Sequence, residues 1–221
     1  MIDLHTHSIF SDGALVPAEL AQRAFARGVT ALAITDHVDH SNVGIVVPAI
    51  VRFCREMADG DIILLPGMEI THVPPAKIAA LAAEGRRLGA AIVVVHGETV
   101  VEPVAPGTNH AAIVAGVDIL AHPGLLSAED AALAAAKGVC LEITARKGHS
   151  LTNGRVAALA SAAHAGLVLN TDAHQPEDLI DLDFARVVAL GAALSDSDFE
   201  AMLLNSRRLV DRARRRKGKK K

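Results

Sequence analysis

The sequence predicts a single α/β domain built as a closed barrel of parallel strands, and three observations support that fold class. Seven short runs rich in Val, Ile and Leu alternate along the chain with Ala-rich amphipathic segments. The runs are almost continuously apolar, as expected of parallel strands that are buried on both faces. About seven strand–helix units in a chain of 221 residues favour a closed barrel over an open sheet.

The seven predicted strands are bounded by turn residues and share this apolar character. They cover residues 2–5, 31–35, 62–69, 91–96, 118–122, 139–144 and 166–170. Four of the segments between them open with residues that favour a helix start, namely Pro17, Pro74-Pro75, Ser127 and Thr152-Asn153. Glycines expected to end helices in the left-handed conformation are Gly28, Gly89, Gly138 and Gly166.

The remaining organisation is simple, since no linker or internal repeat divides residues 1–206. The longest irregular stretch at a strand end, residues 97–108, is either a lid beside a site or a plain connection. Cys54 and Cys140 fall in a predicted helix and a predicted strand without a metal-binding spacing, as buried thiols in a reducing compartment would. No secretory signal is visible, so a cytoplasmic location is expected.

Composition excludes several classes of protein. Hydrophobic residues make up 51% of the chain and charged residues 21%, which argues against disorder. No apolar run approaches the roughly 20 residues of a membrane span, so no membrane partner is expected. Five Phe and no Trp or Tyr leave few aromatic platforms for stacking single-stranded nucleic acid.

The charge of the chain is uneven. Residues 207–221 hold ten Lys or Arg and one Asp, which leaves 12 basic and 24 acidic residues in the preceding part. We interpret residues 1–206 as the barrel domain and residues 207–221 as a basic C-terminal tail. Such a tail is either a solvated terminus or a binding element for polyanions, including nucleic acid.

Metal-type ligands follow nearly every predicted strand. They are His5 and His7, Asp36 and His37, Glu69, His96, His122, and Asp172 with His174. The C-terminal ends of barrel strands converge on one face, so these residues are expected to share one pocket. Nitrogen and oxygen ligands without cysteine suit Zn, Mn or Fe, and this set exceeds what one ion can take. Isolated histidines such as His40, His110 and His164 are left out of the site.

Six motifs carry a family resemblance: DLHTHSIFSDG at 3–13, AITDH at 33–37, PGMEI at 66–70, VVHGE at 94–98, LAHPG at 120–124 and NTDAH at 170–174. Together and in this order they resemble the polymerase and histidinol phosphatase (PHP) family. The resemblance implies a distorted seven-stranded (β/α) barrel, three divalent metal ions per chain and metal-dependent phosphoesterase activity.

The resemblance also implies a division of the ligands. His5, His7, Glu69 and Asp172 would hold a first ion, and Glu69 would bridge to a second ion held by His96 and His122. Asp12, His37 and His174 would hold the third; family members carry either His or Asp at the position of Asp12. Asp36 is expected to orient a ligand from behind.

The metals imply the mechanism. A metal-bound water shared by two cations has its pKa lowered toward neutrality, and the resulting hydroxide attacks phosphorus in line. Arg146, Lys147 and His149 follow the sixth predicted strand and are candidates for binding the substrate phosphate. The alternative for these three residues is a solvated loop.

A small phosphomonoester, histidinol-phosphate-like or a nucleotide, is the substrate expected first. A nuclease or phosphodiesterase acting on nucleic acid or 5′ nucleotides is the main alternative, which the basic tail favours and the missing Trp and Tyr disfavour. An amidohydrolase-type barrel would need a Lys at a strand end, and none is found there. A non-catalytic metal-binding scaffold would be expected to have lost ligands. Oligomeric state is not predicted.

Overall fold

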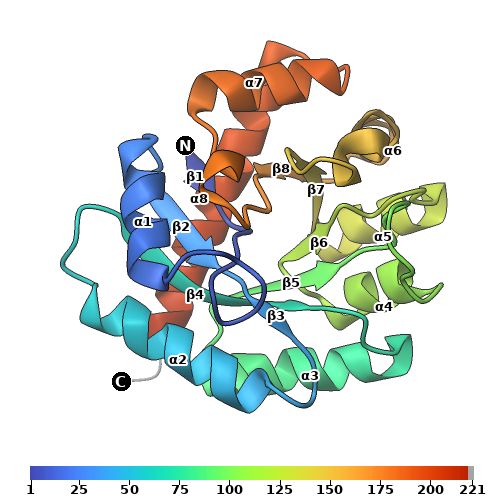
Figure 1. Ribbon diagram of the computed structural model, residues 1–221. Helices are drawn as coiled ribbons and strands as arrows, with labels where there is room; N and C mark the ends of the chain where they lie inside the picture. Colours follow the sequence, from blue (N-terminus) through green and yellow to red (C-terminus); the bar gives the residue numbers. More distant parts are fainter. Residues whose placement is uncertain (219–221) are drawn as a thin grey trace.

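A computed structural model describes residues 1–218 and shows a parallel sheet curled into a nearly closed barrel, with helices outside it (Figure 1). The strands are β1 (Ile2–Asp3), β2 (Ala31–Ile34), β3 (His37–Val38), β4 (Ile63–Ile70), β5 (Ile92–His96), β6 (Ile119–Ala121), β7 (Cys140–Thr144) and β8 (Leu167–Asn170). They pair in the order β1-β2-β4-β5-β6-β7-β8, with the short β3 on β4. The predicted distorted barrel is confirmed.

Helices connect the strands. They are α1 (Pro17–Ala26), α2 (Val43–Glu56), α3 (Pro75–Leu88), α4 (Thr108–Ala115), α5 (Ala128–Lys137), α6 (Asn153–Ala163), α7 (Leu182–Gly191) and α8 (Asp196–Gly218), with short 3₁₀ turns at His149–Thr152 and Pro176–Asp178. The predicted start signals are observed: Pro17 and Pro75 begin α1 and α3, and the Ser127 hydroxyl accepts from the amide of Asp130 at the start of α5.

The barrel closes between β1 and β8 without a regular ladder. The amide of His7 donates to the carbonyl of Ala173 over 2.9 Å, and the amide of Asp172 donates to the carbonyl of His5 over 2.9 Å. Below these bonds the amide of Leu4 donates to the side-chain oxygen of Asn170 over 2.8 Å. The first and last strands therefore meet mainly at their C-terminal ends.

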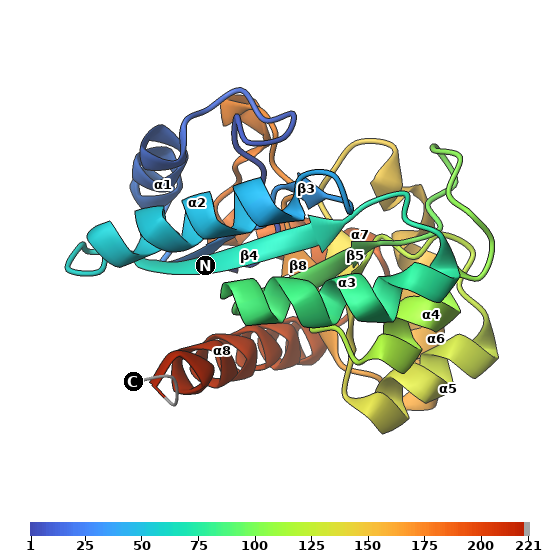
Figure 2. The ribbon, with the colours of Figure 1, turned by 90° about the horizontal axis from the view of Figure 1, so that it is seen from below.

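Helix α8 closes the other end of the barrel. It packs on β8 and β1, and Figure 2 shows it as a long red helix that ends near the C-terminus. Its residues Leu209, Val210 and Ala213 are buried in the same apolar cluster as barrel residues such as Ile92 and Val168. A second, larger apolar cluster fills the space between the sheet and the surrounding helices.

This packing changes the interpretation of the C-terminus. The expected boundary between residues 206 and 207 falls inside α8, and the helix is continuous from Asp196 to Gly218. Up to residue 216, apolar and basic side chains alternate with helical spacing, so one face packs under the barrel. Residues 207–216 are therefore part of the domain rather than a solvated terminus; residues 219–221 of the predicted tail lie outside the described residues.

Two other expectations differ in detail. Gly166 does not end α6 in the left-handed conformation; His164 does, with φ 55°. The stretch 97–108 is irregular only to Gly107, because α4 begins at Thr108. At the other predicted ends Gly28, Gly89 and Gly138 all have positive φ.

Gly124, which follows the turn after β6, gives a testable prediction. Its φ is +62°, and an added Cβ would collide with the backbone carbonyl of Glu98. Gly124→Ala is expected to lower the free energy of unfolding by about 3 kcal/mol, since the left-handed backbone and the collision both cost energy. Gly138→Ala is the matched control, because Gly138 has φ +67° with nothing within 4 Å, and it should cost about 1 kcal/mol. Equal midpoints in urea for the two variants would contradict this account.

Candidate metal centre

The predicted ligands do converge at the C-terminal ends of the strands. His5 and His7 follow β1, Glu69 lies near the end of β4, His96 ends β5, His122 follows β6, and Asp172 and His174 follow β8. Successive side chains of a strand point to opposite faces of the sheet. On β5, Ile92 and Val94 point into the barrel, and His96, two residues further on, therefore points inward as well. The same spacing leads from Val168 through Asn170 to Asp172.

The innermost group combines two imidazoles and two carboxylates. His5 Nε2 lies 3.2 Å from Glu69 Oε1 and 3.6 Å from Asp172 Oδ1. His7 Nε2 lies 3.5 Å from Glu69 Oε2 and 3.2 Å from Asp172 Oδ1. All four residues are buried. Glu69 thus faces both rings, one oxygen to each.

A second group lies on the side of β2 and β8. Asp12 Oδ1 is 3.2 Å from His174 Nε2 and 3.5 Å from His37 Nε2, and the ring of His7 stacks on that of His174 at 4.1 Å between centroids. The Asp12 carboxylate is half-exposed, and the hydrogen bond from His174 and the charge of His37 outweigh burial and lower its pKa to about 2. Asp12 therefore stands at the mouth of the site.

The third group lies on the side of β5 and β6. The rings of His96 and His122 are 4.5 Å apart, and His149 stacks on His122 at 4.2 Å. Glu102, from the loop between β5 and α4, places Oε2 3.0 Å from His96 Nε2 and Oε1 3.5 Å from His149 Nε2. The loop that was either a lid or a plain connection therefore carries a carboxylate into the site.

The chemistry of these groups fits divalent metal ions. Five buried ligand-type atoms have no hydrogen-bond partner among the described residues: His5 Nε2, His7 Nε2, both carboxylate oxygens of Glu69, and His122 Nδ1. Uncompensated buried polar atoms cost several kcal/mol unless something satisfies them. Cations coordinated by nitrogen and oxygen would satisfy them together.

The electrostatics of the metal-free residues divide the rings into two sets. Although burial favours the neutral ring, the carboxylates of Glu142 and Glu69 hold the pKa of His5 well above its usual value. Despite burial, Glu69 raises the pKa of His37 to about 9, so metal binding at these two rings would release protons. Burial and the neighbouring His37 hold the pKa of His7 well below its usual value, and burial and His96 do the same for His122, so both rings are neutral as ligation requires. Although burial favours the neutral acid, His5 and His37 hold the pKa of Glu69 well below its usual value. Burial raises the pKa of Asp172 to about 7, with repulsion from Glu69 adding to the shift despite the opposing charge of His5, and a cation would relieve that repulsion.

Comparison with known proteins adds the family. The PHP domain model matches residues 3–146. This chain belongs to the PHP domain family. The sequence-based assignment is confirmed, and with it the enzyme class, a hydrolase of phosphoric ester bonds that uses divalent metal ions.

Relatives and solved structures extend the match over most of the PHP chain. An uncharacterized protein, MJ1295 of Methanocaldococcus jannaschii, is 48% identical over 206 residues, 92% of this chain and 94% of that protein. A chain in the structure of an archaeal ribonuclease P with mature tRNA superposes with a TM-score of 0.71 at 15% identity, over 95% of this chain and 90% of that chain. A histidinol phosphate phosphatase of Lactococcus lactis subsp. lactis, solved with Zn, L-histidinol and phosphate, superposes with a TM-score of 0.58 at 16% identity, over 88% and 94% of the two chains. The two superpositions show the shared fold.

Two carboxylates of this PHP site were missed from the sequence. Glu142, fully buried on β7, has Oε1 2.9 Å from His5 Nδ1, and the same oxygen accepts from the side-chain Nδ2 of Asn170 over 2.8 Å. A ring N–H of His5 that donates to Glu142 leaves Nε2 facing the centre. An acidic residue inside an otherwise apolar strand was the available signal. Glu102 had no such signal, because it lies in an irregular loop.

Asp36 acts on the loop that follows β1 rather than on a ring. Its carboxylate accepts from the amide and hydroxyl of Ser8, at 2.8 and 2.7 Å, and from the hydroxyl of Ser11 at 2.9 Å. These bonds fix the segment between His7 and Asp12. Asp36 thereby positions the segment that carries Asp12, and an orienting role toward a bound ion stays a prediction.

The three candidate phosphate-binding residues, Arg146, Lys147 and His149, lie in different surroundings in the structure. Arg146 Nη1 donates to Asp178 Oδ2 over 2.8 Å, and the same oxygen accepts from the amide of His174. Lys147 is exposed. His149 is buried beside His122, where Thr99 Oγ1 lies 2.7 Å from its Nδ1. Of the three, His149 contacts His122 of the metal centre directly. Arg146 is connected to the centre through Asp178, which also binds the backbone amide of His174.

Within residues 1–218, no helix is both long and apolar enough to cross a bilayer.

Proposed function

We propose that this PHP protein hydrolyses a small phosphomonoester at a centre of three divalent ions, with Zn, Mn and Fe as the candidate metals. The observation that carries the proposal is the buried set of facing imidazole nitrogens and carboxylate oxygens that lack hydrogen-bond partners among the described residues. Burying so many titratable groups together without cations would be strongly unfavourable.

The three groups of side chains divide among the ions. His5, His7, Glu69 and Asp172 would hold the first, and Glu69 would reach the second together with His96 and His122. Asp12, His37 and His174 would hold the third. Among the described residues, potential ligand atoms lie within 4.8 Å of one another in sets that overlap with this division: His5, His7 and Asp172; His5, Glu69 and His122; His7, Asp12, His37 and His174; His96, His122 and His149; and His72, His96 and Glu102. His149 is therefore also a candidate ligand for the second ion.

The protein's own contribution is to fix this geometry. Divalent ions in such a centre supply a water nucleophile that is deprotonated near neutral pH, and they neutralise phosphate charge. Glu142 holds His5 in one orientation and Asp36 holds the loop that ends in Asp12. Glu102 and Asp12, both partly exposed, stand at the rim where substrate enters.

Arg146 is the proposed phosphate-binding residue, and Arg146→Ala is expected to raise KM for a phosphomonoester about tenfold, because a charge-assisted hydrogen bond to phosphate is lost. Metal content should not change. Steady-state kinetics and elemental analysis check both points, and Lys147→Ala, at an exposed position of the same loop, should have a smaller effect. An unchanged KM, or loss of metal through Asp178 and His174, would contradict the assignment.

A nuclease is the second candidate function, and the basic face of α8 is the observation that favours it. Residues 207–216 contain six arginines and one aspartate, and Arg208 and Arg215 are exposed. A nucleic acid held there would show an affinity that falls steeply with salt. The phosphomonoesterase is preferred because the arginines lie at the end of the barrel remote from the ligand cluster.

One experiment separates these functions. Zn- or Mn-reconstituted protein is assayed for phosphate release from small phosphomonoesters, including histidinol phosphate and nucleotides, beside 5′-phosphorylated oligonucleotides and an aryl phosphodiester. Turnover of a small monoester that is lost in Asp172→Ala supports the proposal. Activity confined to oligonucleotides or diesters would replace it with the nuclease, and a chain that binds metal without any turnover would contradict both.

A further inference from the structure

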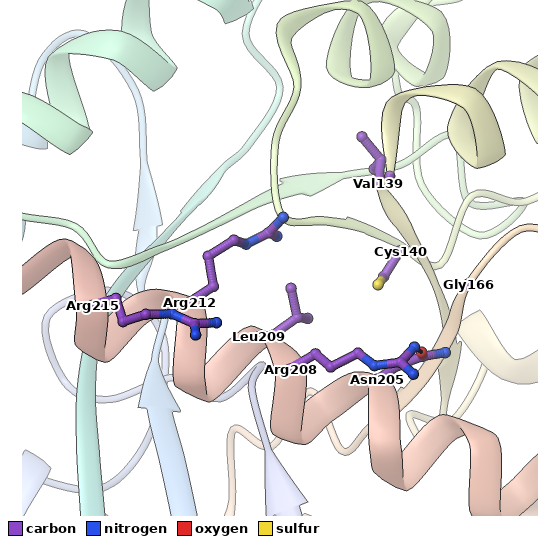
Figure 3. A pocket seen from close by; sticks show the side chains of 9 residues that line it. Val139, Cys140, Gly166, Asn205, Arg208, Leu209, Arg212 and Arg215 are labelled. Carbon is purple, nitrogen blue, oxygen red and sulfur yellow. Dashed lines mark hydrogen bonds between the residues drawn. The ribbon is translucent and has the colours of Figure 1, made fainter.

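A pocket of about 380 Å³ lies at the end of the barrel opposite the metal centre. Its walls are the face of α8 and the N-terminal ends of β7 and β8, where Cys140 begins β7 and Gly166 precedes β8 (Figure 3). Because parallel strands carry the metal ligands at their C-terminal ends, the length of the barrel separates the two sites. The mechanism uses none of the residues that line this pocket.

The pocket is rich in positive charge. Arg208, Arg212 and Arg215 leave α8 at a spacing of three and four residues, which places them along one side of the helix. Arg208 Nη1 makes a long bond of 3.3 Å to Asn205 Oδ1, and Arg215 has no ion pair within the described part of the chain. Two guanidinium groups therefore remain available to an anion.

The neighbouring acid does not neutralise this charge. Buried Asp118 is 2.7 Å from Arg212 Nη2, 3.1 Å from Arg216 Nη1 and 3.0 Å from Arg86 Nη1. One carboxylate thus faces three guanidinium groups. Asp211 lies on α8 between Arg208 and Arg215, but it is exposed and forms no ion pair with either arginine in the described part of the chain, so the arginines still outnumber the acids and the region keeps a net positive charge. The potential inside a pocket with such walls favours an anion.

The remaining walls are apolar. Val139 and Leu209 line the pocket, and Cys140 lies between them and Gly166 (Figure 3). Burial raises the pKa of the Cys140 thiol to about 11, so it adds no negative charge that would repel an anion. An apolar floor with a few convergent charged groups, in a volume of this size, is the usual form of a small-molecule site.

We propose that this pocket, lined by Arg208, Arg212 and Arg215 on α8, binds a phosphate group carried by an organic molecule. The guanidinium groups hold the phosphate oxygens through paired N–H donors, and Val139 and Leu209 contact the apolar part of the ligand. The phosphate belongs either to a free nucleotide-sized molecule or to the end of a nucleic acid strand. The site is independent of the proposed reaction, because it shares no residue with the metal centre.

The test is an NMR titration of the Zn-loaded, ¹⁵N-labelled protein with three probes: inorganic phosphate, AMP and a 5′-phosphorylated oligonucleotide. Amides of Val139 and Gly166 report on the pocket, and amides of the segment from His5 to Asp12 report on the metal centre, so binding at the two ends is distinguished. The double variant Arg208→Gln/Arg215→Gln removes the two available guanidinium groups and keeps the Arg212–Asp118 pair. Arg52→Gln/Arg87→Gln, at exposed positions of α2 and α3, is the charge-matched control.

We expect saturable chemical-shift changes at the amides of Val139 and Gly166. The affinity derived from them should fall at least about tenfold in the double variant and stay unchanged in the control. Shifts with AMP and phosphate identify a small molecule as the source of the phosphate, and shifts with the oligonucleotide alone, decreasing steeply with salt, identify nucleic acid. Hydrolysis of a phosphomonoester should stay within about twofold of wild type in the double variant. Shifts confined to the metal centre with all three probes, or equal affinity in the double variant, would overturn the proposal.

Discussion

Glu69→Gln is expected to lower kcat for phosphomonoester hydrolysis at least about a thousandfold, the equivalent of roughly 4 kcal/mol of lost transition-state stabilisation. The substitution keeps the shape of a fully buried side chain and removes its charge. Among the residues that the structure describes, Glu69 alone has a carboxylate that faces His5, His7, His37 and His122 together, at 3.2, 3.5, 2.7 and 3.7 Å. An amide in its place cannot hold two cations.

The measurement combines kinetics with metal analysis after reconstitution. Fewer bound metal ions per chain should accompany the loss of kcat, while circular dichroism shows a folded protein. Glu129→Gln, at an exposed position in the first turn of α5, is the control and should keep both metal and activity. A Glu69→Gln protein that binds as much metal as wild type and turns over normally would show that Glu69 is not part of the metal centre.

Asp118→Asn is expected to have a large effect on stability, comparable with that of Gly124→Ala. Asp118 is 1% exposed, and its carboxylate faces Arg86, Arg212 and Arg216 and accepts from the amide of Val93 over 2.9 Å. The asparagine keeps an acceptor but removes the negative charge that the three guanidinium groups share. Removing one partner of a buried ion pair lowers the free energy of unfolding by about 3–5 kcal/mol. Because the arginines are partly solvated, we expect a smaller loss of about 2–3 kcal/mol for Asp118→Asn.

Thermal unfolding checks this expectation. For a chain of this length, Tm should fall by roughly 5–10 °C. Asp211→Asn is the matched control, since Asp211 is exposed on the same helix, and its Tm should stay near that of wild type. A small shift for Asp118→Asn would mean that α8 is held under the barrel by Leu209, Val210 and Ala213 alone.

The convergence of the ligands was predictable because it follows from topology. Parallel strands joined by helices bring their C-terminal ends to one face, and His5, Glu69, His96 and Asp172 all stand at such ends. Periodicity alone does not distinguish a short apolar run from a buried helix, and the strands were predictable because their runs are short, rich in Val and Ile, and bounded by helix-start and helix-end signals. All seven predicted strands have a counterpart in the barrel.

The contributions of Glu102, Glu142 and α8 were not predictable in the same way. Glu102 reaches His96 only through the path of an irregular loop, and no local pattern encodes that path. The basic residues of α8 dominated its composition and obscured an apolar face of three or four side chains. Short β3, at His37–Val38, exists because β4 is long enough to pair with β2 at one end and with β3 at the other.

Backbone strain marks two of the ligands. His122 and Asp172 have φ values of 26° and 53°, a region that residues with a Cβ seldom occupy. Such conformations persist only where the surroundings fix them. At Asp172, the amide bond to the carbonyl of His5 and the adjoining bond between His7 and Ala173 supply that constraint.

The closure of β1 against β8 sets the order in which the protein can mature. His5 and His7 lie more than 160 residues before Asp172 and His174, and the barrel joins the two ends of this span. Contacts so distant in sequence form late and slowly in folding. A metal centre that needs both ends of the span is incomplete until β8 has joined the sheet, so we expect tight metal binding to follow closure of the barrel.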